Sequence, residues 1–580
     1  MSQDFFHDDM RWFLQSRVDW DHLFRLQGRE GVSVPEEVGT YVSVLETLEE
    51  ICRELDADAR AHWHDEAMLV DGRVQVPPHI AHGYEKLRSA GLICLPISPE
   101  YGGYGLPFLV NTFYLEMLAH ANSSLMTIVG LQAGVAGDIE KYGSPDLKAR
   151  YLPKLTSGEW QGSMDLTEPQ AGSDLGGIVT KVSEENGRYF VDGEKIFITN
   201  GGSEVHLVLA REAGTFRESL GTTNGLSLVL VPAELPDGSR NRMQVTRVER
   251  KMGLHGSPTC VVEFDHAEGF ILGVRGQGFR AMLDLMNNAR LGVAAQALGV
   301  AHAAYEEALA YAKQRIQFDQ PIVEQPLVKS MLTQMTINLQ AARALLYRTA
   351  TLVDRLEVLR RRLERGGSEL PTPEQHQELE QLTQTVRLLT PLCKYYATEI
   401  SNDVTRKAIQ IHGGLGYMAE SAVAHFHCDS IITTIYEGTS EIQASFALKE
   451  MSKGSLFTLL DQIAGEVAAL RQTYPEECGR IETLIEKRIR TSLPSLLENP
   501  RYALLNAKRL AEMVIDVVAA AELLHQASRS EAKRLAARSF LDRRSLAIEM
   551  GARRIQSGDV RRLTRYDVIL GIDSGTGQKS

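Results

Sequence analysis

The feature that most constrains the fold is a change of hydrophobic period near residue 164, with a second change near residue 281. Before residue 164, stretches such as SVLETLEEICRELDADARAHW repeat apolar residues at helical spacing. Between 164 and 280 the apolar residues form short runs rich in β-branched and aromatic side chains, bounded by turn residues. Beyond 281 the helical spacing returns. The order helix, strand, helix excludes a parallel α/β fold and a repeat array.

With 580 residues, the chain is too long for one ordinary core. We therefore predict a mainly α protein with a central β domain. The predicted boundaries are an N-terminal extension at 1–40, an N-terminal helical domain at 41–163, a β domain at 164–280, a helical domain at 281–451 and a further helical domain at 452–580.

Local signals support this division. Ser144 before Pro145 is typical of a helix start, and Asn186-Gly187 is typical of a tight hairpin turn. Leucines at heptad-like spacing flank the segment RGGSELPTPEQ, and Thr372, Pro373 and Gln375 suit a capping box. These signals predict a long helical hairpin at about 352–390, which we interpret as a packing element without chemistry.

Composition excludes several classes of protein. The net charge of −13 argues against nucleic-acid binding as the main role. The N-terminal MSQDFFHDDMRWFL is unlike a signal peptide, and no apolar run is long enough to predict a membrane span. Six scattered cysteines without a CxxC motif predict reduced thiols in a cytoplasmic protein, with no metal site.

The last helical segment has a local basic bias. Solvation or intramolecular pairing is the favoured interpretation, and weak contact with an acidic membrane surface or partner is the alternative. The arginines concerned are Arg538, Arg543, Arg544, Arg553, Arg554, Arg561, Arg562 and Arg565.

Five segments could carry chemistry: MDLTEPQAGSDLGG, KIFITNGG, KQRIQFDQPI, QIHGGLGYMAES and TTIYEGTSEIQ. Phe197 and Thr199 lie two apart, so they share a strand face, where a ring and a hydroxyl suit a flat polar ligand. Arg315 and Phe318 are predicted to lie one helical turn apart. In the fifth segment Glu437 follows Tyr436 and precedes a glycine. Taken singly, each segment is more often structural than functional.

In this order, the five segments resemble the acyl-CoA dehydrogenase family of flavoproteins. The resemblance covers about residues 41–451 and rests on LTEPQAGSD, ITNGG, QFDQPI, QIHGGLGY and IYEGTSEIQ. It implies a β-barrel-like middle domain and a C-terminal four-helix bundle. The additional C-terminal helical domain is similar to that of the larger branch, which includes the very-long-chain enzymes.

The resemblance also implies bound FAD and, within β-oxidation, conversion of an acyl-CoA thioester to the trans-2-enoyl-CoA. Glu437 matches the family's base, which removes the α-proton while hydride passes to the flavin. In the family, the backbone N–H of this residue and a flavin ribityl hydroxyl bind the thioester carbonyl. The implied partners are an electron-transferring flavoprotein and a second copy of the chain in a homodimer.

Carried over by motif, the implied ligand contacts form two groups. Residues implied to touch FAD are Met164, Leu166, Thr167, Ser173, Phe197, Thr199, Arg315, Phe318, Gln410, Gly413, Gly414, Thr439 and Glu441. Residues implied to lie near the substrate are Ser173, Asn287, Arg290, Tyr436 and Gly438.

The sequence departs from the family pattern at three positions. Asp319 replaces a usual glycine, Pro326 a frequent glutamine and Cys428 a common arginine before Asp429. The last change is expected to remove a salt bridge near the base loop.

Two alternatives keep the fold: an acyl-CoA oxidase that uses dioxygen, and a low-turnover relative associated with flavin or nucleic acid. Acyl-chain length and side groups are not predicted, although the larger branch favours medium-to-long or bulky groups.

Overall fold

A computed structural model describes residues 4–364, 372–497 and 499–572. The chain divides into two compact units. The first comprises Met1–Met335, Ala350–Ser368 and Ala397–Gly438, and the second comprises Thr336–Thr349, Glu369–Tyr396 and Thr439–Ser580. The tip of the predicted hairpin, residues 365–371, lies outside the described residues.

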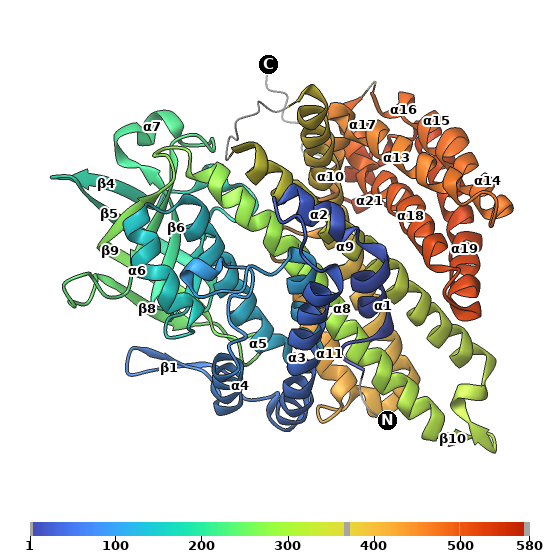
Figure 1. Cartoon of the computed structure of the whole chain (residues 1–580), viewed down its shortest axis with the longest axis horizontal. Helices are drawn as coiled ribbons and strands as arrows, with labels where there is room; N and C mark the ends of the chain where they lie inside the picture. The colour runs from blue at the N-terminus through green and yellow to red at the C-terminus, as the bar shows by residue number, and fades with distance from the viewer. Residues whose placement is uncertain (1–3, 365–371, 498, 573–580) are drawn as a thin grey trace. The chain divides into compact units, whose positions relative to one another are not determined.

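The first unit begins with helices, as the sequence predicts (Figure 1). Ser144 accepts a hydrogen bond from the Leu147 N–H at 3.4 Å, which confirms the predicted helix start. Non-helical dihedrals at Asn122 interrupt the longest of these helices. The elements are α1 (Asp8–Trp12), α2 (Trp20–Leu26), α3 (Val34–His62), β1 (Met68–Val70), β2 (Arg73–Gln75), α4 (Pro78–Ser89), α5 (Phe108–Tyr142) and α6 (Pro145–Thr156).

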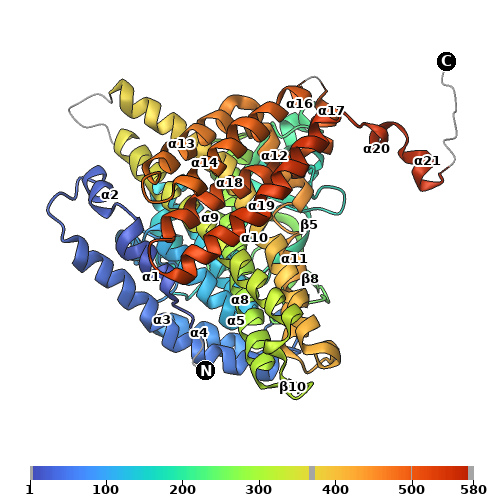
Figure 2. The same ribbon diagram turned by 90° about the vertical axis from the view of Figure 1, so that its right-hand side faces the viewer.

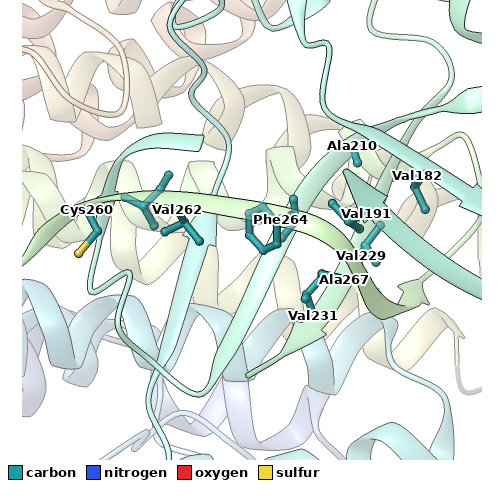
Figure 3. Packing of buried hydrophobic residues seen from close by; sticks show 11 residues of the cluster. Val182, Val191, Ala210, Val229, Val231, Cys260, Val262, Phe264 and Ala267 are labelled. Atoms are coloured by element: carbon teal, nitrogen blue, oxygen red, sulfur yellow. The ribbon is translucent and has the colours of Figure 1, made fainter. Parts of the chain in front are cut away.

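The β domain is a sheet closed into a ring. Strands β6, β4, β5, β9 and β7 pair in that order, and β7 pairs again with β6. The interior is a cluster of valines with Phe264 and Cys260 (Figure 3). The elements are β3 (Gly162–Asp165), β4 (Lys181–Glu185), β5 (Arg188–Thr199), β6 (Val205–Glu212), α7 (Phe216–Ser219), β7 (Leu226–Pro232), β8 (Met243–Val248) and β9 (Thr259–Leu272).

The predicted hairpin turn is present between β4 and β5. Asn186 and Gly187 have φ values of 53° and 78°, and Glu185 pairs with Arg188. Both central residues thus have the positive φ that this turn requires.

Helices return after the β domain. In the first unit these are α8 (Gly278–Gln314), the short hairpin β10 (Ile316–Gln317) and β11 (Gln320–Pro321), and α11 (Ala422–Thr433). Two long helices, α9 (Pro326–Glu364) and α10 (Pro373–His412), contribute segments to both units. The capping box of α10 is confirmed, because Thr372 and Gln375 exchange hydrogen bonds of 3.0 and 3.3 Å.

The second unit is helical, and α13, α14, α18 and α19 lie together in Figure 2. Its elements after Gly438 are α12 (Ser440–Glu450), α13 (Leu456–Ala469), α14 (Pro475–Leu484), α15 (Arg490–Ser492), α16 (Pro494–Leu497), α17 (Pro500–Leu505), α18 (Ala507–Gln526), α19 (Glu531–Gln556), α20 (Arg561–Thr564) and α21 (Tyr566–Leu570).

Intramolecular pairing accounts for part of the basic bias in this unit. Arg538 pairs with Glu477 and Arg544 with Asp516, both at 2.6 Å. Arg561 pairs with Asp559 at 2.7 Å. Across the described ranges, no helix combines the length and apolar composition needed to cross a bilayer.

Candidate active site

Two of the predicted flavin segments meet at β3 and β5. The Lys195 ammonium donates to the Leu166 carbonyl and the Ile196 N–H to the Thr167 carbonyl, both at 2.9 Å. Leu166 is buried, and Thr167 is half-buried. The structure therefore brings Met164–Thr167 beside Phe197–Thr199, as a shared ligand would require.

Phe197 lies on a β-bulge. The pairing of β5 with β9 shifts register between Lys195 and Ile198. Phe197 has φ of 59° and is 61% exposed, whereas Thr199 is half-buried. Bulges that redirect a side chain are frequent beside active sites, and positive φ is uncommon for a bulky residue. A large exposed ring in this conformation indicates a ligand-binding position.

Glu168, from the first motif, has a role that sequence analysis missed. Its carboxylate accepts from the Lys195 ammonium at 2.8 Å and from the N–H groups of Val179 and Thr180 at 2.8 and 3.0 Å. Burial opposes its charge, but the ammonium and these donors keep the pKa of Glu168 below its usual value. This buried pair anchors the loop that carries the exposed Ser173.

The prediction for Arg315 and Phe318 was wrong in its local structure. α8 ends at Gln314, and the chain reverses through the hairpin β10–β11. Phe318 and Asp319 form its turn, with φ of 54° and 61°. Aspartate tolerates this left-handed conformation, which explains how Asp319 can stand where the family has glycine. The Phe318 ring is 86% exposed.

The fourth motif lies beside the end of α8. Tyr311 stacks on His412 with ring centroids 4.3 Å apart, so the C-terminal ends of α8 and α10 are neighbours. Gln410, Gly413 and Gly414 are exposed there. The structure thus gathers the third and fourth motifs on one exposed surface of the first unit.

Glu437 lies in the loop after α11. It is half-buried and has φ of 57°, and Gly438 follows with φ of 97°. A non-glycine residue held in the left-handed region carries backbone strain that is common at active sites. Two successive positive φ values turn the chain sharply at the predicted base.

Buried polar groups surround this loop. The Arg290 guanidinium donates to the Glu437 carbonyl at 3.5 Å and to the Asn287 side chain at 2.9 Å. The Tyr436 hydroxyl donates to Gln296, a buried residue absent from the sequence predictions. Burial and the Glu437 charge raise the pKa of Tyr436, so the phenol stays protonated as a donor.

The departure at Cys428 leaves Asp429 with other partners. The Leu254 N–H donates to its carboxylate at 2.7 Å, and His425 lies 3.3 Å from it, one helical turn away. A Cβ on Gly253 would lie 2.7 Å from this carboxylate. The expected loss of an arginine contact is therefore offset by a histidine and a close-packed loop.

Thr439 and Glu441 fall in the second unit. The Thr439 hydroxyl caps α12 by accepting from the Ile442 N–H at 3.4 Å. The exposed Glu441 pairs with Lys508 at 3.1 Å. Their contact with FAD stays a prediction.

Three domain models of one family match the chain. They are the acyl-CoA dehydrogenase N-terminal domain over residues 43–159, the middle domain over 163–267 and the C-terminal domain over 276–364 and 374–452. The chain belongs to the acyl-CoA dehydrogenase family. It is therefore an oxidoreductase of a family that uses FAD, and the predicted family, fold class and cofactor are confirmed.

Relatives in this family span most of the chain. The 3-methylmercaptopropionyl-CoA dehydrogenase of Ruegeria pomeroyi is 34% identical over 458 residues, covering 75% of this chain and 74% of that protein. The structure of Caenorhabditis elegans ACDH-11 in complex with C11-CoA has a TM-score of 0.77 at 19% identity, covering 97% and 95%. An acyl-CoA dehydrogenase from Bacillus anthracis complexed with FAD has a TM-score of 0.69 at 21% identity, covering 90% of each chain.

The residues at β3 and β5 fit a flavin. An exposed aromatic ring at Phe197 can lie against a flat ring system, and the hydroxyls of Thr167, Ser173 and Thr199 can hydrogen-bond its polar edge. Met164 and Leu166 supply the apolar surface that such an amphipathic ring also needs.

Proposed function

We propose that this acyl-CoA dehydrogenase converts an acyl-CoA thioester to its trans-2-enoyl-CoA, with Glu437 as the base that removes the α-proton. The observation that carries the proposal is the strained, half-buried Glu437, held beside Gly438 and contacted by Arg290 through its carbonyl oxygen. A base must first be positioned near one hydrogen, and this loop geometry fixes its position.

The residues around Glu437 supply the remaining requirements. Positive φ at both Glu437 and Gly438 supports the presentation of a carboxylate and a backbone N–H from one short loop. An N–H aimed at the thioester oxygen would stabilise its developing charge by about 3 kcal/mol. Tyr436 precedes the base and is half-buried, so its ring reduces the access of water to this loop.

The cofactor-binding role is assigned to the residues at β3 and β5. Met164, Leu166, Thr167, Ser173, Phe197 and Thr199 would hold the flavin ring and its neighbouring phosphate. Bound FAD supplies the acceptor for the β-hydride. The protein has to orient the substrate between that acceptor and Glu437.

The exposed surface formed by the third and fourth motifs supports a homodimer. Arg315, Phe318, Gln410, Gly413 and Gly414 gather on one surface of the first unit, where they are available to the adenosine end of a second copy's FAD. Light scattering after size exclusion should give twice the 64.3 kDa chain mass. A monomer or tetramer would contradict this proposal.

The activity is tested by mixing the purified holoenzyme anaerobically with a panel of acyl-CoA thioesters. Bleaching of the flavin absorbance, with formation of the enoyl-CoA, is expected for some members. A flavin that no acyl-CoA bleaches would contradict the proposed function and favour a low-turnover role. Reoxidation by an electron-transferring flavoprotein is expected, whereas rapid formation of hydrogen peroxide in air would indicate an oxidase.

A further inference from the structure

A polar pocket lies close to the base loop within the first unit. Its wall includes Trp63 directly after α3, His79 from α4, Ser123 from α5 and His425 from α11. Gln296 links it to the loop, because its side-chain N–H donates to the Ser123 hydroxyl at 2.9 Å and its carbonyl oxygen accepts from Tyr436. The pocket wall and the base loop are thus neighbours, joined through the side chain of Gln296.

One buried group in the pocket lacks a partner. His79 is 7% exposed, and in the part of the chain that the structure describes its Nδ1 has no hydrogen-bond partner. His62 stacks on the ring, with centroids 5.7 Å apart and planes 16° apart. A buried polar atom without a partner costs free energy, which a ligand that bonds to it would recover.

The kink in α5 adds a second polar feature to the same wall. Asn122 has φ of −155° and ψ of 96°, and its side chain accepts from the Leu125 N–H at 3.0 Å. Asn122 thus caps a new helical segment that runs to Tyr142, and Ser123 and Ser124 form its first turn. All three residues line the pocket. The start of a helix favours ligand atoms that accept hydrogen bonds.

The charges in the wall disfavour a negatively charged ligand. Arg60 pairs with Asp56 at 2.7 Å, and the Asp429 carboxylate faces His425 at 3.3 Å. Two carboxylates and one guanidinium give the wall a net negative charge when its histidines are neutral. Burial lowers the pKa of His79, in keeping with a neutral ring. A carboxylate on the ligand would be repelled, and a methyl group would leave Nδ1 unsatisfied.

We infer that this pocket selects acyl-CoA substrates that carry a hydroxyl group toward the distal end of the acyl chain, with His79 as the specificity-determining residue. A hydroxyl both donates and accepts, so it can bond Nδ1 of His79 in either tautomer and still accept at the start of the α5 segment. This inference rests on the proposed function and names the substrate class for that site.

The test compares acyl-CoA series of four to ten carbons whose chains end in a methyl, hydroxyl, carboxylate or ammonium group. At the best chain length, kcat/KM for the hydroxyl series should exceed that for the methyl series at least about tenfold, since a site built for a hydroxyl rejects the analogue without it. The carboxylate series should be poorer still, and the ammonium series should stay below the hydroxyl series because an ammonium group cannot accept at the start of the α5 segment. The corresponding trans-2-enoyl-CoA products should show the same order in dissociation constants measured by calorimetry.

Variants assign the preference to its residue. His79→Phe keeps the stacked ring and should abolish the hydroxyl preference in KM and in product binding. His79→Asn, whose amide can replace Nδ1, should retain part of it. His82→Phe, at an exposed position of the same helix, should behave as the wild type. If kcat/KM for methyl, carboxylate or ammonium chains equals or exceeds that for hydroxyl chains, the inference is overturned while the proposed function stands. If no series bleaches the flavin, both are overturned.

Discussion

The flavin side and the base side of the first unit are built in different ways. At β3 and β5, Met164, Phe197 and Thr199 lie on strands of the sheet, and backbone hydrogen bonds between neighbouring strands hold those strands in place. Around Glu437 the contacts join side chains far apart in sequence, such as Gln296 to Ser123, which are 173 residues apart. The sheet side therefore depends on strand pairing reinforced by the Lys195–Glu168 pair, whereas the base loop depends on helix packing.

The largest effect on stability is expected where a charged pair supports the sheet side. Lys195→Met leaves the buried Glu168 carboxylate without its ammonium, which should cost about 4 kcal/mol and release bound FAD. Denaturant unfolding of the holoenzyme and FAD retention on a desalting column measure both effects.

Lys181→Met, an exposed lysine on the same sheet, is the control and should change stability by less than about 0.5 kcal/mol. If Lys195→Met unfolds like this control and keeps FAD, the buried pair does not support the flavin loop.

The helical side should respond strongly at its N-terminal segment, which precedes the region matched by the family models. Trp20 is buried, donates to the Leu14 carbonyl at 2.6 Å and packs on Tyr41 with centroids 5.4 Å apart. Trp20→Ala should therefore cost about 3 kcal/mol in the free energy of unfolding.

Trp20→Phe retains the ring and should recover most of this loss. An unchanged unfolding midpoint for Trp20→Ala would mean that the segment is a dispensable addition. In that case the helical side would depend on α3, α5 and α8 alone.

An effect of a different kind should appear as a pH dependence at the start of α5. Burial raises the pKa of Asp354 to about 7, although the N–H groups of Phe108 and Leu109 donate to its carboxylate at 2.6 and 3.0 Å. The folded protein thus binds this proton more tightly than the unfolded chain. Its contribution to stability is present below about pH 4 and is lost as the pH rises to 7, by at most about 1.4 kcal/mol per unit.

Asp354→Asn should remove this slope when unfolding is followed from pH 4.5 to 7.5. Asp21→Asn, at an exposed carboxylate, should leave it in place. A wild-type protein that gains stability relative to Asp354→Asn over this range would show that the two N–H donors outweigh burial.

Local structure could be predicted from the sequence where a few adjacent residues determine it. The Ser144 cap, the Asn186-Gly187 turn and the box at Thr372 all follow from side-chain hydrogen bonds or positive φ within four residues. The flavin motifs were recognisable as sequence segments, but the bulge at Phe197 interrupts the alternation that the spacing of Phe197 and Thr199 predicts.

The remaining features depend on tertiary structure. Arg315 and Phe318 share helical spacing, but strand pairing with Gln320 and Pro321 reverses the chain there. Gln296, Ser123 and His79 carry no local motif, and only the packing of α4, α5 and α8 brings them near the base loop.

The central claim is that Glu437 removes the α-proton. The most direct test is stopped-flow measurement of anaerobic flavin reduction in Glu437→Gln, with the exposed Glu420→Gln as the matched control. We predict that Glu437→Gln folds, keeps FAD and binds acyl-CoA, yet reduces the flavin at least about 1,000-fold more slowly, while Glu420→Gln matches the wild type. Flavin reduction by Glu437→Gln within tenfold of the wild-type rate would contradict the assignment.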